Sequence, residues 1–346
     1  MSGLAVLKDM TFSELEDYVL SLGEKKYRAK QIFRRMYEGA SSADEFTDLP
    51  KSLRSRLSQE ASFSAVAMRK RQISSDGTRK YLFDVAGGDA VESVLMHYKY
   101  GWTVCISSQA GCRMGCAFCA SGISGLSRSL TAGEIADQIV AVSRDIGERV
   151  SHVVVMGIGE PFDNYDQLVK ALEIIHDERG LGIGWRNITV STCGLVDRIG
   201  RFAADMPQVG LAVSLHAPND EIRHQLMPIS KRYSMDELLA ACRDYTEATH
   251  RRITFEYALI DGINDSDKCA SELSARLRGM LCHVNLIPVN SVKEKPYSSS
   301  RRQRAEEFAG ILDRHGIPVT IRRQLGADIS AACGQLRLQE REKESR

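Results

Sequence analysis

The sequence of 346 residues predicts an α/β fold in which repeated strand–helix units close into a full or partial barrel. Two observations support this class. Short apolar and β-branched runs alternate with helical patterns from residue 103 onward, and capping boxes at Thr131–Glu134 and Ser234–Glu237 begin two of those helices. Repeated βα units form a parallel sheet covered by helices, and the chemistry of such barrels gathers at the carboxyl ends of the strands.

Before the barrel, the chain is predicted to form a helical accessory domain over residues 1–62. A capping box of Thr11 and Glu14 begins a first helix, and residues 25–37 have the pattern of a second. Pro50 suits the first turn of a third helix, since its missing N–H group is not needed there. Three short helices therefore precede the β-rich part of the chain.

An antiparallel β extension is expected next, over residues 63–97, because alternating short runs are separated by Asp-Gly and Gly-Gly turn signals. The core barrel is expected over residues 98–330 and a C-terminal segment over residues 331–346. The strands of the extension are predicted at residues 66–73, 81–85 and 91–96, and those of the barrel at residues 103–107, 152–156, 187–191, 211–215, 253–259, 283–288 and 318–321.

Composition excludes several classes of protein. No apolar stretch approaches the roughly 20 residues that a membrane span needs, and the first residues lack the cationic start and apolar core of a secretion signal. The nine cysteines follow no disulfide framework, which favours a reducing compartment and thiols used for ligation or catalysis. We therefore expect a cytoplasmic protein that does not contact a membrane.

The net charge of +1 indicates no partner by itself, but the charges are unevenly distributed. Residues 1–80 hold 15 Lys and Arg against 11 Asp and Glu, whereas the remainder holds 31 against 34. Clusters such as Lys25-Lys26 with Arg34-Arg35 suit a phosphate backbone. A solvated basic face explains the same pattern, so the charges alone leave RNA binding open.

The most informative motif is the run of Cys112, Cys116 and Cys119, which follows directly on the first barrel strand. Intervals of four and three residues let three thiolates surround one small inorganic cluster. A 4Fe-4S cluster usually takes four cysteine ligands, and no fourth cysteine follows at a matching interval. One iron is therefore left without a protein ligand and is able to bind a small molecule.

A zinc site is the alternative for these cysteines. Structural zinc sites are closed and four-coordinate, and no His or Cys completes the loop nearby. The glycines of the loop and the ring of Phe118 would also pack close to inorganic sulfide. The sequence therefore favours an open iron–sulfur cluster.

Polar residues recur where the predicted barrel strands end. The second strand ends in a glycine turn with Gly159 and Glu160, and the Glu160 carboxylate is able to hold an ammonium group. Ordinary strand-end capping explains part of such a pattern, but a polar cofactor needs the same arrangement. The further members are Ser191 after the third strand, Ser214, Leu215 and His216 after the fourth, and Asn290 beyond the sixth.

Three more residues have two interpretations each. Cys105 lies in the first barrel strand and Cys333 after the last. A free cysteine is ordinarily a small buried hydrophobe. Glu92 stands among apolar residues, where burial is able to raise a carboxylate pKa into the range of a useful base; an outward-facing strand glutamate is the alternative.

Four segments give these residues a common context: CISSQAGC from residue 105, MGIGEP from 156, SLHAPND from 214 and AACGQL from 331. They resemble the RlmN/Cfr family of radical S-adenosylmethionine (SAM) RNA adenosine methyltransferases, and the resemblance extends over residues 11–338. It implies a partial (β/α)6 radical SAM barrel, a 4Fe-4S cluster held by the three cysteines, and SAM on the open iron. Two SAM molecules would be consumed per turnover.

The resemblance also implies roles for Cys333, Cys105 and Glu92. Cys333 would accept a methyl group from one SAM, and a second SAM, cleaved at the cluster, would supply the radical that activates this methyl for addition to the base. Cys105 would then attack the Cys333 sulfur and release the product with a transient disulfide. Glu92 would remove the ring proton. The cysteines that match no motif and are expected to be structural are Cys193, Cys242, Cys269 and Cys282.

The substrates that the resemblance implies are 23S rRNA, in its peptidyl-transferase region, and tRNA, next to the anticodon, each methylated on carbon 2 of an adenosine. Flavodoxin or ferredoxin would donate electrons, and we expect a monomer. One alternative is carbon-8 methylation, which confers antibiotic resistance. The others are a radical SAM enzyme on a non-RNA substrate and a zinc-stabilised RNA-binding module; the basic N-terminal domain and the Cys105/Cys333 pair disfavour the non-RNA substrate.

Overall fold

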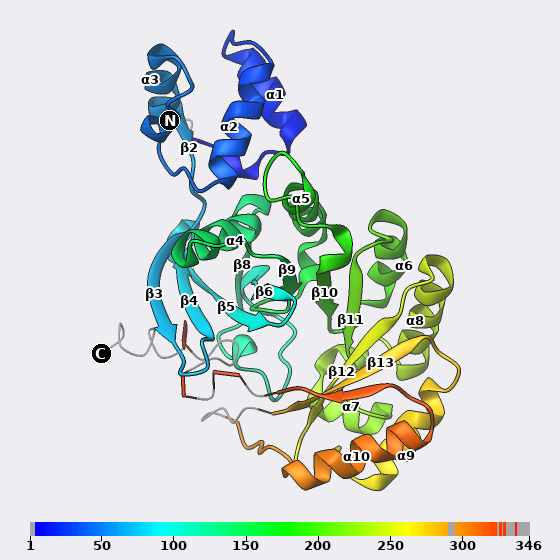
Figure 1. Ribbon diagram of the computed structural model, residues 1–346. Coiled ribbons are helices and arrows are strands. Elements are labelled where there is room, and N and C mark those ends of the chain that lie inside the picture. The colour runs from blue at the N-terminus through cyan, green and yellow to red at the C-terminus, as the bar shows by residue number, and fades with distance from the viewer. Residues whose placement is uncertain (1–3, 290–294, 324, 327, 330–335, 338–346) are drawn as a thin grey trace.

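A ten-stranded sheet dominates the computed structural model of the chain, with its strands in the order β14-β13-β12-β11-β10-β9-β6-β5-β4-β3. The run from β6 to β14 is parallel and curves into a barrel, and β5, β4 and β3 continue it as an antiparallel extension (Figure 1). The edge strands β14 and β3 do not pair with each other in the described residues, so the barrel is partial, as predicted. The structure describes residues 4–289, 295–323, 325–326, 328–329 and 336–337.

All seven predicted barrel strands are present, with ends that differ from the prediction by at most two residues. They are regular because each is an apolar or β-branched run whose alternate side chains are buried under the helices. The strands are β6 (Gly101–Cys105), β9 (His152–Val155), β10 (Ile188–Thr192), β11 (Gly210–Ser214), β12 (Ile253–Leu259), β13 (Cys282–Pro288) and β14 (Val319–Ile321).

Helices connect these strands and cover the outside of the barrel (Figure 1). Both predicted capping boxes are present, at Thr131 before α4 and at Ser234 before α8. The helices are α4 (Ala132–Ile146), α5 (Tyr165–His176), α6 (Val196–Asp205), α7 (Asp220–Leu226), α8 (Met235–Thr249), α9 (Asp267–Leu277) and α10 (Arg302–Arg314).

Strand alternation gives the barrel an apolar outer face and a polar inner face. Outward-facing side chains such as Val104, Val153 and Phe255 are fully buried in the core under the helices. Their inward-facing neighbours on adjacent strands lie side by side in register. The inner face carries Thr189, Ser191, Ser214, Glu256 and Asn285.

The predicted antiparallel extension is confirmed as β3 (Ala67–Ile73), β4 (Arg79–Asp84) and β5 (Ala90–Tyr98). It joins the barrel because β5 pairs antiparallel with β6. Two short parallel or antiparallel pairs were not predicted: β1 (Ala5–Val6) with β2 (Ala61–Ser62), and β7 (Gln109–Gly111) with β8 (Leu126–Ser129).

The three predicted N-terminal helices are α1 (Phe12–Ser21), α2 (Tyr27–Tyr37) and α3 (Lys51–Glu60), and they project from one end of the barrel (Figure 1). The expected capping box of Thr11 and Glu14 begins α1. Phe12 packs edge-on against Phe33, with 5.5 Å between ring centroids, and so joins α1 to α2. None of the helices in the described part of the chain is long and apolar enough to cross a membrane.

The accessory helices are tied to the barrel by a buried ion pair between Lys8 and Asp137 of α4. The Asp137 carboxylate also accepts hydrogen bonds from the backbone N–H groups of Ala65, at 2.7 Å, and Val66, at 3.1 Å. One carboxylate therefore holds both the segment that enters the accessory helices and the segment that leaves them.

Candidate active site

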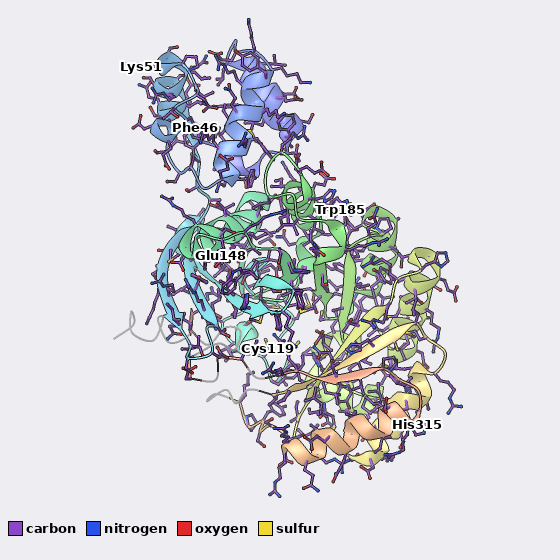
Figure 2. All side chains as sticks on the ribbon, viewed as in Figure 1. Phe46, Lys51, Cys119, Glu148, Trp185 and His315 are labelled. Atoms are coloured by element: carbon purple, nitrogen blue, oxygen red, sulfur yellow. The ribbon has the colours of Figure 1, made fainter. Side chains whose placement is uncertain are left out.

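A cavity of about 290 Å³ opens at the carboxyl ends of the barrel strands. The cysteine loop forms one wall, and the ends of β9 to β13 form the others. Figure 2 shows Cys119 between the extension and the barrel strands. The predicted site residues that line the cavity are Cys112, Cys116, Cys119, Gly159, Glu160, Ser191, Ser214 and His216.

The cysteine loop is held at both ends by the β7–β8 ladder. Gly111 ends β7 with a positive φ of 87°, and a Cβ added there would lie 2.0 Å from the carbonyl oxygen of Gly125. Only glycine permits this close approach. The backbone N–H of Cys112 donates to the same carbonyl oxygen at 3.0 Å. This pairing fixes the two ends of the cysteine loop next to each other, which the sequence alone did not reveal.

Two of the three thiols, those of Cys112 and Cys116, occupy a setting that disfavours bare thiolates. Burial raises the pKa of Cys112 to about 12 and that of Cys116 further, and the neighbouring thiols raise both. A bound metal centre reverses this effect, because its positive charge deprotonates coordinating thiols. The residues thus fit a group that brings several metal ions.

The arrangement of these thiols fits a cluster better than a single ion. A zinc ion needs its ligand atoms within about 2.3 Å of one point. In the described residues, no three His, Cys, Asp or Glu side chains form a group that could hold one metal ion. Three separate cysteines around a shared cavity instead suit three different irons of a 4Fe-4S cluster.

Glu160 lies at the end of β9 with its carboxylate fixed by two backbone N–H groups. Cys193 donates to Oε2 at 2.7 Å and Phe162 donates to Oε1 at 3.0 Å. The N–H of Glu160 donates to Oε1 of Gln109 at 2.9 Å, which joins this turn to β7 beside the cysteine loop. Burial raises the pKa of Glu160, so a cationic partner in the cavity would stabilise its charged form.

His216 follows β11 with a positive φ of 55°, which is uncommon for a residue other than glycine. Its Nδ1 accepts the N–H of Ala258 at 2.9 Å, so a neutral ring carries its proton on Nε2. Burial lowers its pKa to about 3. The ring packs edge-on against Phe118, with 4.9 Å between centroids, and so braces the cysteine loop.

Leu215 differs from its two predicted neighbours. Its side chain is fully buried in the apolar core outside the barrel and does not line the cavity. Its backbone N–H donates to the carbonyl oxygen of Glu256 at 3.0 Å. A contact between Leu215 and a cofactor would therefore have to use its backbone.

Glu256 of β12 lines the cavity but was not predicted. Its Oε2 accepts a hydrogen bond from Nδ2 of Asn285 at 2.8 Å, and burial raises its pKa. It lies in register with Ser214 on the inner face of the sheet. An acidic residue inside a buried strand, at an alternate position, was the signal that could have identified it. Arg322 and Cys193 also line the cavity without having been predicted to do so.

Glu92 lies on β5 and is buried, but not in the apolar surroundings that the sequence indicated. Nζ of Lys80, on the neighbouring strand β4, lies 2.8 Å from its Oε2, and both side chains are almost completely buried. The N–H of Arg337 donates to its Oε1 at 2.6 Å. The lysine escaped prediction because lysine side chains in strands ordinarily face solvent.

Cys105 lies on β6 opposite Val94 of β5 and two positions along that face from Glu92. Its thiol packs in a small cluster with Met96, Val154 and Met156, and Met156 lines the cavity. Cys105 therefore belongs to a cluster of side chains of which one, Met156, lines the cavity.

Cys333 and Asn290 lie outside the described residues. Two of the described residues before and after Cys333 contact the strands that carry Cys105 and Glu92, and a third, Asp328, accepts hydrogen bonds from Ser74 and Ser75 at the β3–β4 turn. Leu325 packs against the cluster of Cys105, and Arg337 bonds to Glu92.

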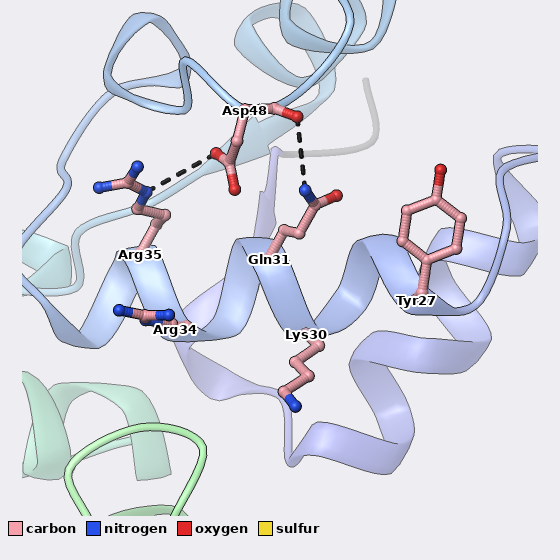
Figure 3. Close-up of a pocket in the computed structure, with 6 residues that line it drawn as sticks. All are labelled: Tyr27, Lys30, Gln31, Arg34, Arg35 and Asp48. Atoms are coloured by element: carbon pink, nitrogen blue, oxygen red, sulfur yellow. Dashed lines mark hydrogen bonds and ion pairs between the residues drawn. The ribbon is translucent and has the colours of Figure 1, made fainter.

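The accessory domain carries a separate hollow on the exposed side of α2 (Figure 3). Tyr27 and Lys30 are exposed there, and Arg34 pairs with Glu38 at 2.7 Å. Asp48 lies opposite α2, and its carboxylate is 3.6 Å from Nε of Arg35 on that helix (Figure 3). Basic side chains beside an exposed aromatic ring are typical of surfaces that bind nucleic acid.

Two family models match the chain. The Radical SAM superfamily matches residues 106–270, and the ribosomal RNA large subunit methyltransferase N-terminal domain matches residues 6–63. Relatives described as probable dual-specificity RNA methyltransferase RlmN occur in Desulforamulus reducens and Alkaliphilus oremlandii. Each is 52% identical over 96% of this chain, which spans 95% and 97% of their respective lengths.

A solved structure gives the same result for the fold. The crystal structure of a radical SAM methyltransferase from Sphaerobacter thermophilus has a TM-score of 0.93 to this chain and 48% sequence identity. The match covers 96% of this chain and 99% of the other. It therefore includes the accessory helices, the extension and the barrel.

Proposed function

The chain belongs to the RlmN family of radical SAM RNA methyltransferases, and on that premise we propose that it methylates carbon 2 of adenosine in 23S rRNA and in tRNA. As in other radical SAM enzymes, its cofactors are a 4Fe-4S cluster and SAM. When bound, this pair supplies the radical chemistry, and the protein supplies binding, orientation and protection from water.

We infer that both cofactors bind in the cavity. Cys112, Cys116 and Cys119 would each ligate one iron. The fixed carboxylate of Glu160 would accept the amino group of SAM. The remaining contacts would come from the polar strand ends, namely Gly159, Ser191, Ser214, the backbone of Leu215, His216 and Asn290.

Cys333, Cys105 and Glu92 would carry the transfer to RNA. The Cys333 thiol accepts the methyl group, and the Cys105 thiol attacks the Cys333 sulfur after the base has been joined to it, which forms a disulfide and frees the product. Glu92 takes the ring proton from the adenine. The ion pair with Lys80 and the hydrogen bond from the Arg337 N–H fix the position of this carboxylate, as a group that removes a proton from a bound base requires.

One observation carries this assignment. Among the described residues before and after Cys333, Leu325 packs with the cluster of Cys105 and Arg337 bonds to the carboxylate of Glu92, while Asp328 accepts hydrogen bonds from Ser74 and Ser75 at the β3–β4 turn. The chain is thereby returned to the two strands where a methyl-bearing thiol would need its resolving thiol and its base.

The accessory domain, which we assign to residues 1–62, would bind RNA through the exposed side of α2. Tyr27, Lys30 and Arg34 supply an aromatic face and positive charge there. The enzyme would work as a monomer in the cytoplasm, where its RNA substrates occur. It would draw single electrons from a small carrier such as flavodoxin or ferredoxin.

Mass spectrometry of digested RNA tests the proposal. Reconstituted enzyme, SAM and a reductant are incubated with 23S rRNA or tRNA from cells that lack the enzyme, and the nucleosides are separated. We expect 2-methyladenosine in both. Formation of 8-methyladenosine would establish the carbon-8 alternative, and reductive cleavage of SAM with no methylated RNA would indicate a non-RNA substrate.

A further inference from the structure

Arg223, in α7, has the largest fully buried side chain in the described part of the molecule. Its Nη2 donates to the carbonyl oxygen of Cys193 at 2.8 Å, and its Nε donates to that of Leu215 at 3.3 Å. Its Nη1 has no hydrogen-bond partner, and no carboxylate among the described residues forms an ion pair with it. A positive charge is thus buried with two carbonyl dipoles and no anion.

A nearby negative charge would stabilise this buried positive charge. Burying an unpaired ion costs far more than burying a paired one, and a guanidinium keeps its proton inside proteins. Asp220, in the first turn of the same helix, accepts the N–H of Met235 at 2.8 Å and acts on Arg223 only from a distance. The neighbouring His216 ring is neutral, since burial and then Arg223 lower its pKa to about 3.

The cysteine loop packs against the last turn of α7. The N–H of Ala117, in the loop, donates to the carbonyl oxygen of Leu226, in α7, at 2.8 Å. Cys116 packs against Leu226 and Met227. Cys193, whose carbonyl oxygen accepts the hydrogen bond from Arg223, lies in the same cluster as Cys116, and both residues line the cavity.

We propose that Arg223 is the built-in counter-charge of the iron–sulfur cluster and raises its reduction potential. The inference rests on the cluster that the family uses. Three thiolates make the cluster site anionic, and each reduction adds one more electron, supplied from outside by the reductant. A nearby buried cation stabilises the reduced state more than the oxidised state, because net charge around the cluster sets its potential.

The positive charge and the hydrogen-bonding fork of Arg223 are separable by two variants. Arg223→Met removes the charge and keeps an unbranched apolar side chain of similar reach, whereas Arg223→Lys keeps the charge and loses the fork. The measurement is a redox titration of the reconstituted full-length protein with dithionite and mediators, followed by the electron paramagnetic resonance signal of the reduced cluster. Iron content is determined for each sample.

We expect Arg223→Met to lower the reduction potential by about 59 mV, which corresponds to a tenfold change in the equilibrium of a one-electron couple. Arg223→Lys should stay within a third of that shift. The control is Arg113→Met, which removes an exposed charge from the cysteine loop itself; its side chain is 59% exposed and pairs with Asp163. Solvent screens such a charge, so the potential should change little.

Each other outcome has a defined meaning. An unchanged potential in Arg223→Met, or equal shifts in the Met and Lys variants, would overturn the inference. If Arg223→Met took up no iron while Arg223→Lys assembled a cluster of wild-type potential, the need for charge would be established. If both failed to assemble, the fork rather than the charge would matter and the inference would fail. A wild-type protein that binds no cluster would instead contradict the cofactor assignment itself.

Discussion

The cavity and the exposed side of α2 both carry ionisable side chains, but the cavity buries them and α2 exposes them to solvent. In the cavity, Glu160 and His216 are buried, each is fixed by backbone N–H groups, and each has a pKa displaced from its ordinary value. On α2, Arg34 lies in solvent and pairs with a glutamate one turn away. We assign the chemistry to the buried cavity and the recognition of RNA to the solvent-exposed side of α2.

The physical difference predicts how each region responds to change. In the cavity a lost group leaves its partners buried and unsatisfied, so a single substitution should remove a whole step. On the surface each charge is screened and contributes in small increments. Substitutions in the cavity should therefore have much larger effects than substitutions on α2.

The largest effect should follow loss of a cluster ligand. Cys116→Ala leaves two cysteines for a cluster that has three, so reductive cleavage of SAM should fall below detection. Iron analysis and visible absorption after anaerobic reconstitution provide the measurement, with Cys242→Ala, which changes a buried cysteine of α8, as the control. Normal SAM cleavage by Cys116→Ala would show that the loop does not hold the cluster.

A large but partial effect is expected from the proposed base. Glu92→Gln keeps the shape and the contact with the Arg337 N–H but cannot accept the ring proton. General-base catalysis contributes about 10²- to 10⁴-fold, and we expect the methylation rate to fall within that range. SAM cleavage in the absence of RNA should persist, and if it fell in parallel the variant would have damaged the cavity instead.

His216 should make the stability of the protein depend on pH, because its ring is buried in the cavity wall. Its pKa is about 3 in the folded protein, against 6.5 ordinarily, so below pH 6.5 the unfolded chain binds a proton that the folded chain does not. The free energy of unfolding should therefore decrease as pH falls, by about 1.4 kcal/mol per pH unit from this group. This contribution is fully retained only above pH 6.5.

His216→Asn removes the titration and suits the positive φ. Urea unfolding of the cluster-free proteins between about pH 5 and 7.5 compares the two slopes, and the variant should lose the part due to His216. Parallel curves for the two proteins would mean that this ring is not held neutral.

The smallest effect should come from α2. Replacing Lys30 and Arg34 together with Ala should weaken RNA binding about tenfold and reduce the slope of log affinity against log salt by about one to two. Filter binding at several salt concentrations measures both. Lys268→Ala with Arg302→Ala, exposed on the far helices, is the control. Equal losses in both double variants would indicate nonspecific attraction rather than a binding face.

The elements of the barrel could be predicted because their signals are local. The β-branched runs and the capping boxes at Thr131 and Ser234 lie within a few residues of the elements that they define. The cysteine spacing is equally local. These features needed no knowledge of which segments meet in space.

The rest depends on contacts between distant residues. The β7–β8 ladder forms because Gly111 meets Gly125 across the loop, and its strands are too short to have a pattern. Lys80 meets Glu92 only when β4 and β5 pair. Glu256 required the strand register, which decides whether an alternate residue faces the cavity or the core.

In the proposed reaction, Cys333 carries the methyl group to RNA and Cys105 releases the product. Cys105→Ala still permits methylation of Cys333 and addition to the base, but it lacks the thiol that breaks the link. Incubation with labelled RNA, SAM and reductant should accumulate a protein–RNA crosslink that survives a denaturing gel and maps to Cys333 by mass spectrometry. Ordinary turnover by Cys105→Ala without any crosslink would contradict the account.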